Sequence, residues 1–590
     1  MNPDIAQSKF VLDEDRERIL AADSHVLVTG GPGSGKTTIA LLKGEKRIRE
    51  GLAAGQSVLF LSFSRSAVGR ILEASRIQLA KELQNQLAIQ TFHSFFWEVL
   101  RSYGYLLGAP KHLRLLLPQD ERALRNGATD DDPAWRRESE RLFQQVGSVA
   151  FDLFAPKVHE LFKKSGRLRD LFASRYPLII VDEAQDTAED QWHSVRLLAS
   201  KAQLICLADL EQQIYDFRPG VSAKRLTQIM HALRPLRIDL ESANHRSPGS
   251  EIVKFGNDIL LATPRGRGYK GVSRKAFRPD RETRDRAIRS SIGMVSDKVQ
   301  KSLGVPPRSI GVLATWGRGV NIITKALTGN GVTNRIPHRV LIDEAQVLLA
   351  SRLVAYLLEP RKVAEHELAD LAEGLELAAA VFRAKNSTSS LSQAKRFSDQ
   401  AAQANTGKAP KAKAVGSILL NILRKLREHR FTGDPRRDWL EARKELAEAG
   451  TPALSTIGKL AEQLVAFQRG HTIATGLAET WQSQGNYAKA RDVLDSALAQ
   501  DQLLFGANDL DGIHVMTVHK SKAKEFDAVV ILDDANSCPF VYCKEKAPFP
   551  RSRKLLRVGI TRAKHHVLLL TDLFNPSPLL EPQRSPKTGQ

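Results

Sequence analysis

Residues 30–37 carry the letters GGPGSGKT, which satisfy the phosphate-loop pattern G-x-x-x-x-G-K-[ST]. An apolar run precedes them and a helical pattern follows, the context that a working phosphate loop requires. Glycines let backbone amides turn inward around a phosphate at the positive end of the helix. Lys36 can reach the β- and γ-phosphates, and the Thr37 hydroxyl can ligate Mg²⁺. A purely structural glycine turn would need neither side chain. We therefore predict a nucleoside triphosphate site at Gly30, Gly31, Pro32, Gly33, Ser34, Gly35, Lys36 and Thr37.

Two adjacent carboxylates, Asp182 and Glu183, follow the apolar run of residues 178–181. A buried strand that ends there places both at the edge of a sheet. Asp182 can then hold Mg²⁺, and Glu183 can polarise the attacking water. The letters Asp-Glu-Ala-Gln recur at residues 343–346, but that copy follows a shorter apolar run and continues into a helical pattern. We interpret the second pair of acids as solvated residues at a helix start and assign catalysis to the first.

Short apolar runs alternate with helical patterns along the first part of the chain, as in βαβ units. Uninterrupted runs of this kind indicate strands buried on both faces of a parallel sheet. Six runs qualify: residues 26–28, 58–61, 178–181, 204–207, 529–532 and 566–570. Residues from about 340 to about 510 instead have long helical periods and few strand signals. The sequence predicts an α/β protein with helical insertions.

The composition indicates a globular protein with a polyanionic partner. A chain of 590 residues is too long for one ordinary core, so two or more domains are expected. Lysine and arginine number 87 against 66 acids, a formal net charge of +21. Nucleic acid is the usual partner of such an excess, and a merely solvated basic surface is the alternative. Three cysteines exclude a disulfide framework, and the spacing of Cys538 and Cys543 is not typical of zinc ligands.

The N-terminal residues 1–11 are polar and charged where a signal peptide needs an apolar core. No apolar run approaches the roughly 20 residues that span a bilayer. We expect a soluble, cytoplasmic protein without a membrane partner.

Seven further segments resemble, in order, the motifs of the UvrD/Rep/PcrA group of superfamily 1 helicases. Residues 181–187 match its VDEAQDT motif, and residues 91–94 match TFHS. The other five are residues 62–67 (SFSRSA, similar to TFTNKAA), 208–218 (ADLEQQIYDFR, GDxxQSIYxFR), 244–247 (NHRS, NYRS), 517–522 (TVHKSK, TLHxSKG) and 558–563 (VGITRA, VAxTRA). Their number and order make coincidence negligible. The resemblance covers both motor cores and only weakly the helical insertions.

The resemblance implies two RecA-like parallel-sheet motor domains with helical insertion subdomains. The expected parts are a first core (residues 1–97 and 176–246) with a helical insert (98–175), a second core (247–345 and 510–574) with a basic helical insert (346–509), and a disordered tail (575–590). Within the larger insert, residues 386–414 are small, polar and basic and predict loops. Residues 476–499 have the pattern of one tetratricopeptide-like hairpin, which must join a larger helical subdomain because it cannot bury its own face.

The family also implies roles in ATP hydrolysis. Gln212 would sense the γ-phosphate, and Arg246 and Arg562 would act as arginine fingers from the two sides of a cleft. Rigid guanidinium groups stabilise the negative charge that phosphoryl transfer spreads over the phosphate oxygens. ATP would draw the cores together and hydrolysis would release them. Three further positions stand where the family contacts the nucleotide: Thr38, His245 and Glu525.

A nucleic-acid strand would lie across both cores against Phe63, His93, Tyr215, Phe217 and His519. Aromatic faces suit this role because every base offers a face to stack on. Taken alone, Phe63 or Phe217 would be interpreted as a core residue, but their positions inside family motifs favour strand contact. Lysines and arginines of the inserts would hold phosphates, which makes binding depend on salt.

The chain departs from the family at positions that contact the base of the nucleotide. A glutamine near the N-terminus usually reads adenine in the family, and Asp15 or Arg16 stands there instead. The arginine often found after GKT is Thr38, and the tyrosine of NYRS is His245. We therefore expect a relaxed preference for adenine. Two C-terminal motif positions also differ, with Ala523 in place of glycine and Ser552 in place of glutamate.

The leading hypothesis is an ATP- and Mg²⁺-dependent 3′–5′ DNA helicase that moves on single strands and opens duplex junctions, as in DNA repair. The 3′–5′ direction of movement is inferred from the family resemblance alone. A second hypothesis is a DNA-stimulated ATPase subunit that senses nucleic acid and regulates a partner nuclease or effector. Bacterial antiviral defence systems such as Gabija pair a compact UvrD-like protein with a nuclease in this way. A catalytically dead scaffold is disfavoured because every catalytic position named above is present.

Overall fold

The structure is a computed structural model. It describes residues 12–31, 33–63, 65–125, 132–209, 224–240, 249–265, 268–328, 335–341, 345–361, 364–385, 387–462, 472–503, 511–522, 524–542 and 545–581. The chain forms two compact units. The sheet unit comprises Met1–Phe95, Val158–Ile342 and Phe505–Gln590, and the helical unit comprises Phe96–Lys157 and Asp343–Leu504.

The first sheet of the sheet unit has six strands in the order β3-β2-β6-β7-β1-β8, and all its pairings are parallel. The strands are β1 (Val26–Gly30), β2 (Val58–Ser62), β3 (Leu87–Thr91), β6 (Leu178–Val181), β7 (Gln203–Ala208) and β8 (Leu236–Leu240). The four apolar runs predicted in this part of the chain all lie in strands. Polar residues interrupt β3 and β8, so these two strands lack the uninterrupted run that identified the others.

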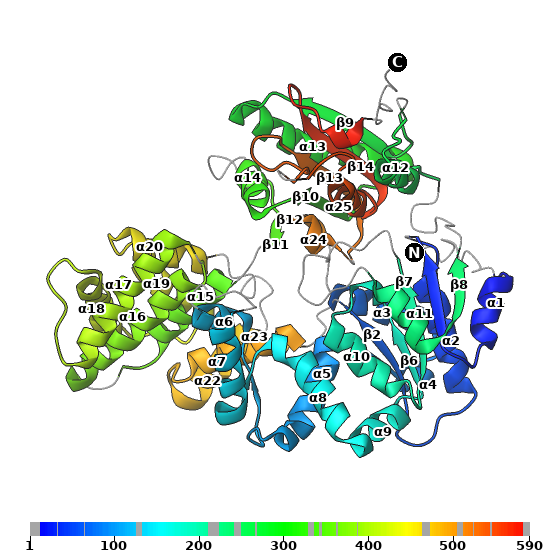
Figure 1. The fold of residues 1–590 in the computed structure, drawn as a ribbon. Helices are drawn as coiled ribbons and strands as arrows, with labels where there is room; N and C mark the ends of the chain where they lie inside the picture. The colour runs from blue at the N-terminus through cyan, green and yellow to red at the C-terminus, as the bar shows by residue number, and fades with distance from the viewer. Residues whose placement is uncertain are drawn as a thin grey trace. The chain divides into compact units, whose positions relative to one another are not determined.

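The helices of this part of the chain are α1 (Glu14–Ala21), α2 (Lys36–Arg49), α3 (Arg65–Gln78), α4 (Lys81–Gln84), α8 (Phe154–Lys164), α9 (Gly166–Arg175), α10 (Glu189–Leu198) and α11 (Arg225–Leu233). Helices α2, α3, α10 and α11 lie around the strands of the first sheet (Figure 1), and successive side chains of a strand point to opposite faces. Val26 and Val28 pack with Ile39 of the helix that follows β1, whereas Leu27 between them is buried on the opposite face. Burial on both faces explains why the central strands have no polar alternation.

The second sheet also has six parallel strands, in the order β11-β12-β10-β13-β14-β9. Its strands are β9 (Val272–Phe277), β10 (Ser309–Ala314), β11 (Arg339–Leu341), β12 (Gly512–Thr517), β13 (Phe526–Asp533) and β14 (Ala563–Asp572). The helices are α12 (Ile252–Leu260), α13 (Arg281–Leu303), α14 (Gly317–Thr328), α24 (Val518–Ser521) and α25 (Pro550–Ile560). Val529 and Ile531 pack with α12 and α25, while Val530 packs with α13 and α14. The fold is therefore α/β with two six-stranded parallel sheets, consistent with the predicted pair of RecA-like domains.

The helical unit is built from α6 (Pro118–Arg125), α7 (Pro133–Arg141), α15 (Ala345–Leu358), α16 (Glu367–Arg383), α17 (Thr388–Asn405), α18 (Val415–Glu428), α19 (Pro435–Ala447), α20 (Pro452–Ala461), α22 (Thr472–Gln484) and α23 (Ala490–Leu503). α5 (Phe92–Tyr103) begins in the sheet unit and continues into this one. The predicted hairpin is α22 and α23. Tyr487 between them is buried and donates a 2.7 Å hydrogen bond from its hydroxyl to Asp438 of α19. The hairpin thus packs within a larger helical core, as expected.

Two predictions from composition are wrong. Residues 386–414 were expected to form loops, yet α17 occupies most of the segment. The Ser387 side chain caps this helix by accepting a hydrogen bond from the backbone of Ser390. Its buried face consists of Ser390, Ala394, Phe397, Ala401 and Ala404, so mostly small side chains supply the stripe.

The disordered tail was predicted to begin at residue 575, but ordered structure continues beyond that point. Pro578–Leu580 form a short 3₁₀ helix, and Leu579 is fully buried against the core of the second sheet. The Leu579 carbonyl also accepts a hydrogen bond from Arg553 at 2.9 Å. Residues 582–590 lie outside the described part of the chain. All strands of the two sheets fall within the segments predicted for the two cores, while the domain bounds themselves stay a prediction. Within the described ranges, no helix combines the length and the apolar character that a membrane span requires.

Candidate functional site

The glycine-rich loop joins the end of β1 to the start of α2. Gly33 and Gly35 have φ angles of 80° and 86°, a left-handed conformation that favours glycine. A Cβ on Gly30 would lie 2.8 Å from the carbonyl oxygen of Leu240, so the backbone passes too close for a side chain. Ser34 Oγ is buried and has no hydrogen-bond partner among the described residues. The loop has the conformation and the donors of a phosphate cradle.

Lys36 is the first residue of α2. Its ammonium group donates hydrogen bonds to the carbonyl oxygens of Gly30 at 2.6 Å and Gly31 at 2.9 Å. The lysine therefore folds back over the loop and concentrates positive charge at the N-terminus of the helix, where a phosphate anion is favoured.

Arg16 of α1 contacts the same loop. Its guanidinium donates a 3.0 Å hydrogen bond to the carbonyl oxygen of Ser34 and forms an ion pair with Asp13. Asp15 instead pairs with the exposed Arg18 at 3.0 Å. Of the two candidates for the position of the family's glutamine, the structure places Arg16 against the phosphate loop.

The second motif is the VDEAQDT segment of residues 181–187, and its two acids, Asp182 and Glu183, follow β6, two strands away from β1. Ser62 at the end of β2 donates a 3.2 Å hydrogen bond to Asp182. Burial, and then repulsion from Glu183, raise the pKa of Asp182 to about 6. Burial alone would also raise the pKa of Glu183, but the positive charges of Lys522 and Lys36 outweigh it and hold that pKa below its ordinary value. The pKa values of these adjacent carboxylates are therefore shifted in opposite directions, and strongly shifted pKa values are frequent at functional sites.

Glu183 has a backbone conformation that is rare for a residue with a side chain, with φ at 51° and ψ at 42°. Gln185 holds its carboxylate through a 2.5 Å hydrogen bond. The Gln185 side chain also accepts a 3.1 Å hydrogen bond from the backbone of Asp209, directly after β7. Such conformations persist where surrounding contacts impose them, and here those contacts fix the direction of the carboxylate.

Lys522 brings a charge from the second sheet to this motif. It follows α24, is almost fully buried, and forms an ion pair and hydrogen bond with the buried Asp186. The same ammonium group lies 3.8 Å from Glu183. The sequence placed both residues inside motifs but assigned neither a role, because 336 positions separate the hydrogen-bonded pair.

Arg562 is buried between α25 and β14. Its Nε donates a 3.0 Å hydrogen bond to the carbonyl oxygen of Val558, which fixes the base of the guanidinium. Its positive charge contributes to the lowered pKa of Glu183. The predicted arginine finger of the second sheet thus acts electrostatically on Glu183, the predicted catalytic residue of the first.

Glu525 also joins the two sheets. Its carboxylate accepts a 2.7 Å hydrogen bond from Arg70 of α3, a residue that the motif comparison left without a role. Near the last motif, Ser552 donates hydrogen bonds to Glu545 from its hydroxyl and its backbone. Ser552 replaces the glutamate of the family motif, but the carboxylate of Glu545 lies next to it.

The predicted nucleic-acid residues lie after strand ends. Phe63 follows β2, His93 follows the end of β3, and His519 follows β12, so each is at the carboxyl edge of its sheet. All three are half-buried, and Phe63 packs against the apolar core beside α25. Thr37 and Thr38 are half-buried in the first turn of α2. The remaining predicted site residues lie outside the described part of the chain, and their roles stay predictions: Pro32, Gln212, Tyr215, Phe217, His245 and Arg246.

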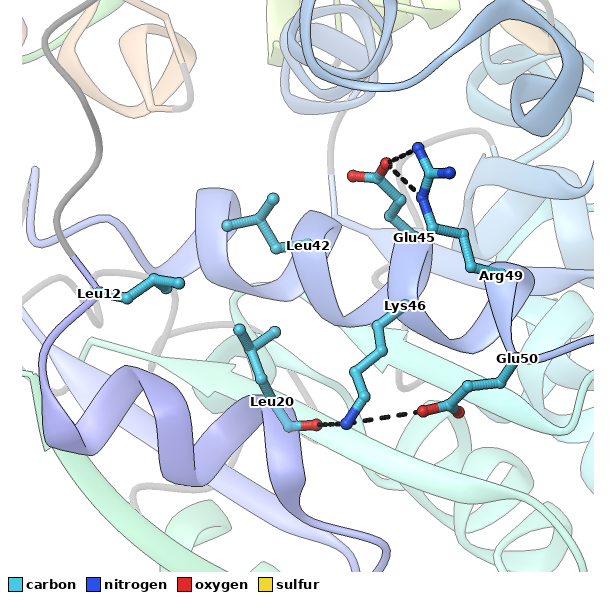
Figure 2. A pocket seen from close by; sticks show the side chains of 7 residues that line it. All are labelled: Leu12, Leu20, Leu42, Glu45, Lys46, Arg49 and Glu50. Atoms are coloured by element: carbon cyan, nitrogen blue, oxygen red, sulfur yellow. Dashed lines mark hydrogen bonds and ion pairs between the residues drawn. The ribbon is translucent and has the colours of Figure 1, made fainter.

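An open hollow of about 460 Å³ lies beside α1 and α2. It is lined by Leu12, Leu20, Leu42, Glu45, Lys46, Arg49 and Glu50. Figure 2 shows that the charged side chains pair with one another or with the backbone, Arg49 with Glu45 at 2.7 Å and Lys46 with the Leu20 carbonyl at 3.0 Å. No residue of the phosphate loop is among this lining, so the hollow is separate from the phosphate site.

Two family profiles match the chain over the segments that carry this geometry. The AAA domain profile matches residues 16–218, and the UvrD-like helicase C-terminal domain profile matches residues 398–572. The first match contains the phosphate loop and Glu183, and the second contains Lys522 and Arg562. The chain belongs to the UvrD-like superfamily 1 helicases. This is a family of ATP-dependent DNA helicases, and its AAA domain implies nucleotide binding at the loop described above.

Curated relatives are similar at low identity. DNA helicase II of Haemophilus influenzae is 27% identical over 297 residues, which cover 42% of this chain and 40% of that protein. YjcD of Bacillus subtilis is 22% identical over 618 aligned positions, 93% of this chain and 77% of YjcD. An ATP-dependent helicase/nuclease subunit of Lactococcus lactis is 23% identical over 453 residues, 68% of this chain and 36% of that protein. The match thus spans less than half of the first and third of these relatives.

The buried ion pair of this UvrD-like chain leads to a stability prediction. Replacing Lys522 by methionine should lower the free energy of unfolding by about 3–5 kcal/mol, because Asp186 would remain buried without its cation. Adding Asp186→Asn removes the stranded charge, so the double variant should be destabilised by less than the sum of the single variants. Urea denaturation of the four proteins measures this coupling, with Lys520→Met, at an exposed lysine two residues away, as the control. Additive single effects would contradict the pairing.

Proposed function

We propose that this chain is a DNA-stimulated ATPase that translocates 3′ to 5′ along single-stranded DNA and unwinds duplex. The observation that carries the proposal is the pairing of charges between motifs. Lys522 and Arg562, from the second sheet, act on acids that follow β6 of the first sheet. A triphosphate bound between these groups would interact with charged side chains of both sheets. Its cleavage would therefore change the electrostatic attraction between the two sheets.

Each side chain of the site has a separate role in ATP hydrolysis. Lys36 binds the β- and γ-phosphates, Glu183 orients the attacking water, and Arg562 stabilises the charge that develops on the transferred phosphoryl group. Gln212 and Arg246 complete the set by their motif positions. Oxygen ligands suit Mg²⁺, and Thr37 and Asp182 would hold it. The raised pKa of the buried Asp182 fits this assignment, since a cation would relieve its unfavourable burial. When bound, Mg²⁺ neutralises phosphate charge.

The DNA strand would follow the carboxyl edges of the two sheets. Phe63, His93 and His519 lie there, and Tyr215 and Phe217 belong to a motif that follows β7. Stacking on aromatic and imidazole faces holds bases without selecting a sequence. The excess of positive charge on the chain, +21, adds phosphate binding that weakens as salt rises.

A second candidate is a motor subunit that serves a partner nuclease or effector, for example in antiviral defence. One specific observation favours it: a relative that covers 68% of this chain is named as a helicase/nuclease subunit. The departures around the base and in the C-terminal motifs are consistent with a specialised role of this kind.

Two assays on the purified chain separate these functions. The helicase predicts ATP hydrolysis stimulated by single-stranded DNA and displacement of a strand from a duplex with a 3′ tail but not a 5′ tail. The regulatory motor predicts DNA-stimulated hydrolysis without displacement until a nuclease is added. Lys36→Ala should abolish hydrolysis in both cases, and Lys46→Ala, on the outer face of the same helix, should not. Absence of DNA-stimulated hydrolysis in the unaltered chain would contradict both functions.

The residues around the base predict weak selection of the nucleotide. We expect the kcat/KM for ATP to exceed that for GTP by no more than about tenfold, because Asp15 or Arg16 stands in place of the family's adenine-reading glutamine and Arg16 is held by the Ser34 carbonyl. Arg16→Ala should change the KM of both nucleotides alike, since the arginine supports the phosphate loop and not the base. Arg18→Ala, at an exposed neighbour, is the control. A preference for ATP of about 10⁴, as hydrogen-bonded recognition provides, would contradict the prediction.

A further inference from the structure

Three potential metal ligands converge on two helices of the first sheet, one that precedes the VDEAQDT motif and one that follows it. His159 lies on α8, and Asp190 and His193 lie one turn apart on α10. One ligand atom from each side chain lies within 4.8 Å of the others. We propose that these residues bind a divalent transition-metal ion of the zinc class. The site is independent of the nucleotide site and of the proposed function.

The separations suit a single ion. Nδ1 of His159 lies 3.4 Å from Oδ1 of Asp190. Bonds of about 2.0–2.2 Å to zinc at tetrahedral angles hold ligand atoms roughly 3.3 Å apart. The two helices therefore already hold this pair at the required separation. His193 needs only a side-chain rotation, because all three atoms are within 4.8 Å of one another.

The donor types favour zinc over magnesium. Two imidazoles and one carboxylate suit Zn²⁺ and its neighbours in the transition series, whereas Mg²⁺ prefers oxygen ligands. The two imidazole rings lie 5.3 Å apart between centroids, so both can face one ion beside Asp190. All three side chains are half-exposed, so an ion can enter, and a fourth position stays open to water.

Glu189 lies behind His193. Nε2 of the His193 ring is 3.5 Å from Oε2 of Glu189, so a hydrogen bond to this carboxylate on metal binding would leave Nδ1 for the metal. Glu189 is itself held by Gln228 at 3.2 Å and by the buried Arg225 at 3.2 Å. A carboxylate behind a histidine ligand is a common feature of metal sites, since it fixes the ring. Arg225 also donates to the carbonyl oxygen of Thr187, so these contacts continue to the end of the second motif.

Bound metal would cross-link α8 to α10. Helices joined through a shared ion cannot separate without losing it, so metal should stabilise this part of the sheet unit. An ordinary contact between two histidines and an acid would give no such dependence on metal.

The test uses the full chain, purified without a histidine tag and stripped by a chelator. Titration with Co²⁺ should give the visible absorption bands of a tetrahedral nitrogen–oxygen site, and Zn²⁺ should displace it at one ion per chain. Each of His159→Ala, Asp190→Asn and His193→Ala should weaken binding by roughly 100-fold or more, because even loss of an outer partner costs about 10–100-fold. His231→Ala, at an exposed histidine of α11, should bind as the unaltered chain does.

Zn²⁺ should also raise the melting temperature of the unaltered chain and of His231→Ala, but not of Asp190→Asn, which keeps the shape of the aspartate. Equal affinity in Asp190→Asn and the unaltered chain would overturn the proposal. Thiolate-to-cobalt charge-transfer bands, which place the ion on cysteine, would overturn it as well, as would failure of the unaltered chain to bind Zn²⁺ at about 1 mM.

Discussion

Arg562→Ala should lower the kcat of DNA-stimulated ATP hydrolysis by about 10³–10⁵-fold, the range that an arginine finger contributes. The charge of Arg562 acts on Glu183, and its Nε is fixed by the Val558 carbonyl. A positioned guanidinium acts mainly where charge accumulates in the transition state, so binding of ATP should change far less than kcat. Single-turnover hydrolysis, together with equilibrium binding of a fluorescent ATP analogue, measures the two effects separately.

Two further variants make this result specific. Arg562→Lys keeps the charge in the buried position but loses the planar fork, so it should recover only a small part of the rate. Arg551→Ala removes an exposed arginine from the first turn of α25 and should hydrolyse ATP normally. A fall in ATP affinity that accounts for the whole loss would show that Arg562 binds the ground state and is not a finger.

Glu183→Gln should lower kcat by about 10²–10⁴-fold, the usual contribution of a group that accepts a proton from the nucleophile. Glutamine keeps the shape of glutamate and can still accept the hydrogen bond from Gln185, so the strained turn after β6 should be preserved. It cannot take up a proton. The variant should therefore bind ATP and DNA together without turnover, which a DNA mobility assay with ATP and a phosphate-release assay detect.

The chain supplies its own control for this variant. Residues 343–346 repeat the letters Asp-Glu-Ala-Gln, and Glu344→Gln makes the same chemical change in the same local sequence. Glu344→Gln should leave hydrolysis unchanged. Equal losses in the two variants would show that the first copy has been wrongly chosen as the catalytic one.

The sequence alone determined the features that depend on neighbouring residues. Six apolar runs identified strands because a parallel strand is buried on both faces and needs no polar alternation. The phosphate loop was identifiable because its chemistry lies within eight consecutive residues, 30–37, whose backbone must turn as glycine permits. Composition failed for α17, where alanines form most of the buried stripe and serine and glutamine are the commonest of the other residues. Small side chains can fill a helix interface, but they carry little hydrophobic signal.

Only the tertiary structure decided which charges meet. Lys522 and Asp186 are distant in the chain, and no local pattern predicts that both are buried and paired. The choice of Arg16 over Asp15 also required the fold, because it depends on which side of α1 packs against the phosphate loop. The cluster of His159, Asp190 and His193 joins two helices whose sequences carry no metal motif. Contacts of this kind depend on how helices and strands pack together, which the order of residues along one segment does not specify.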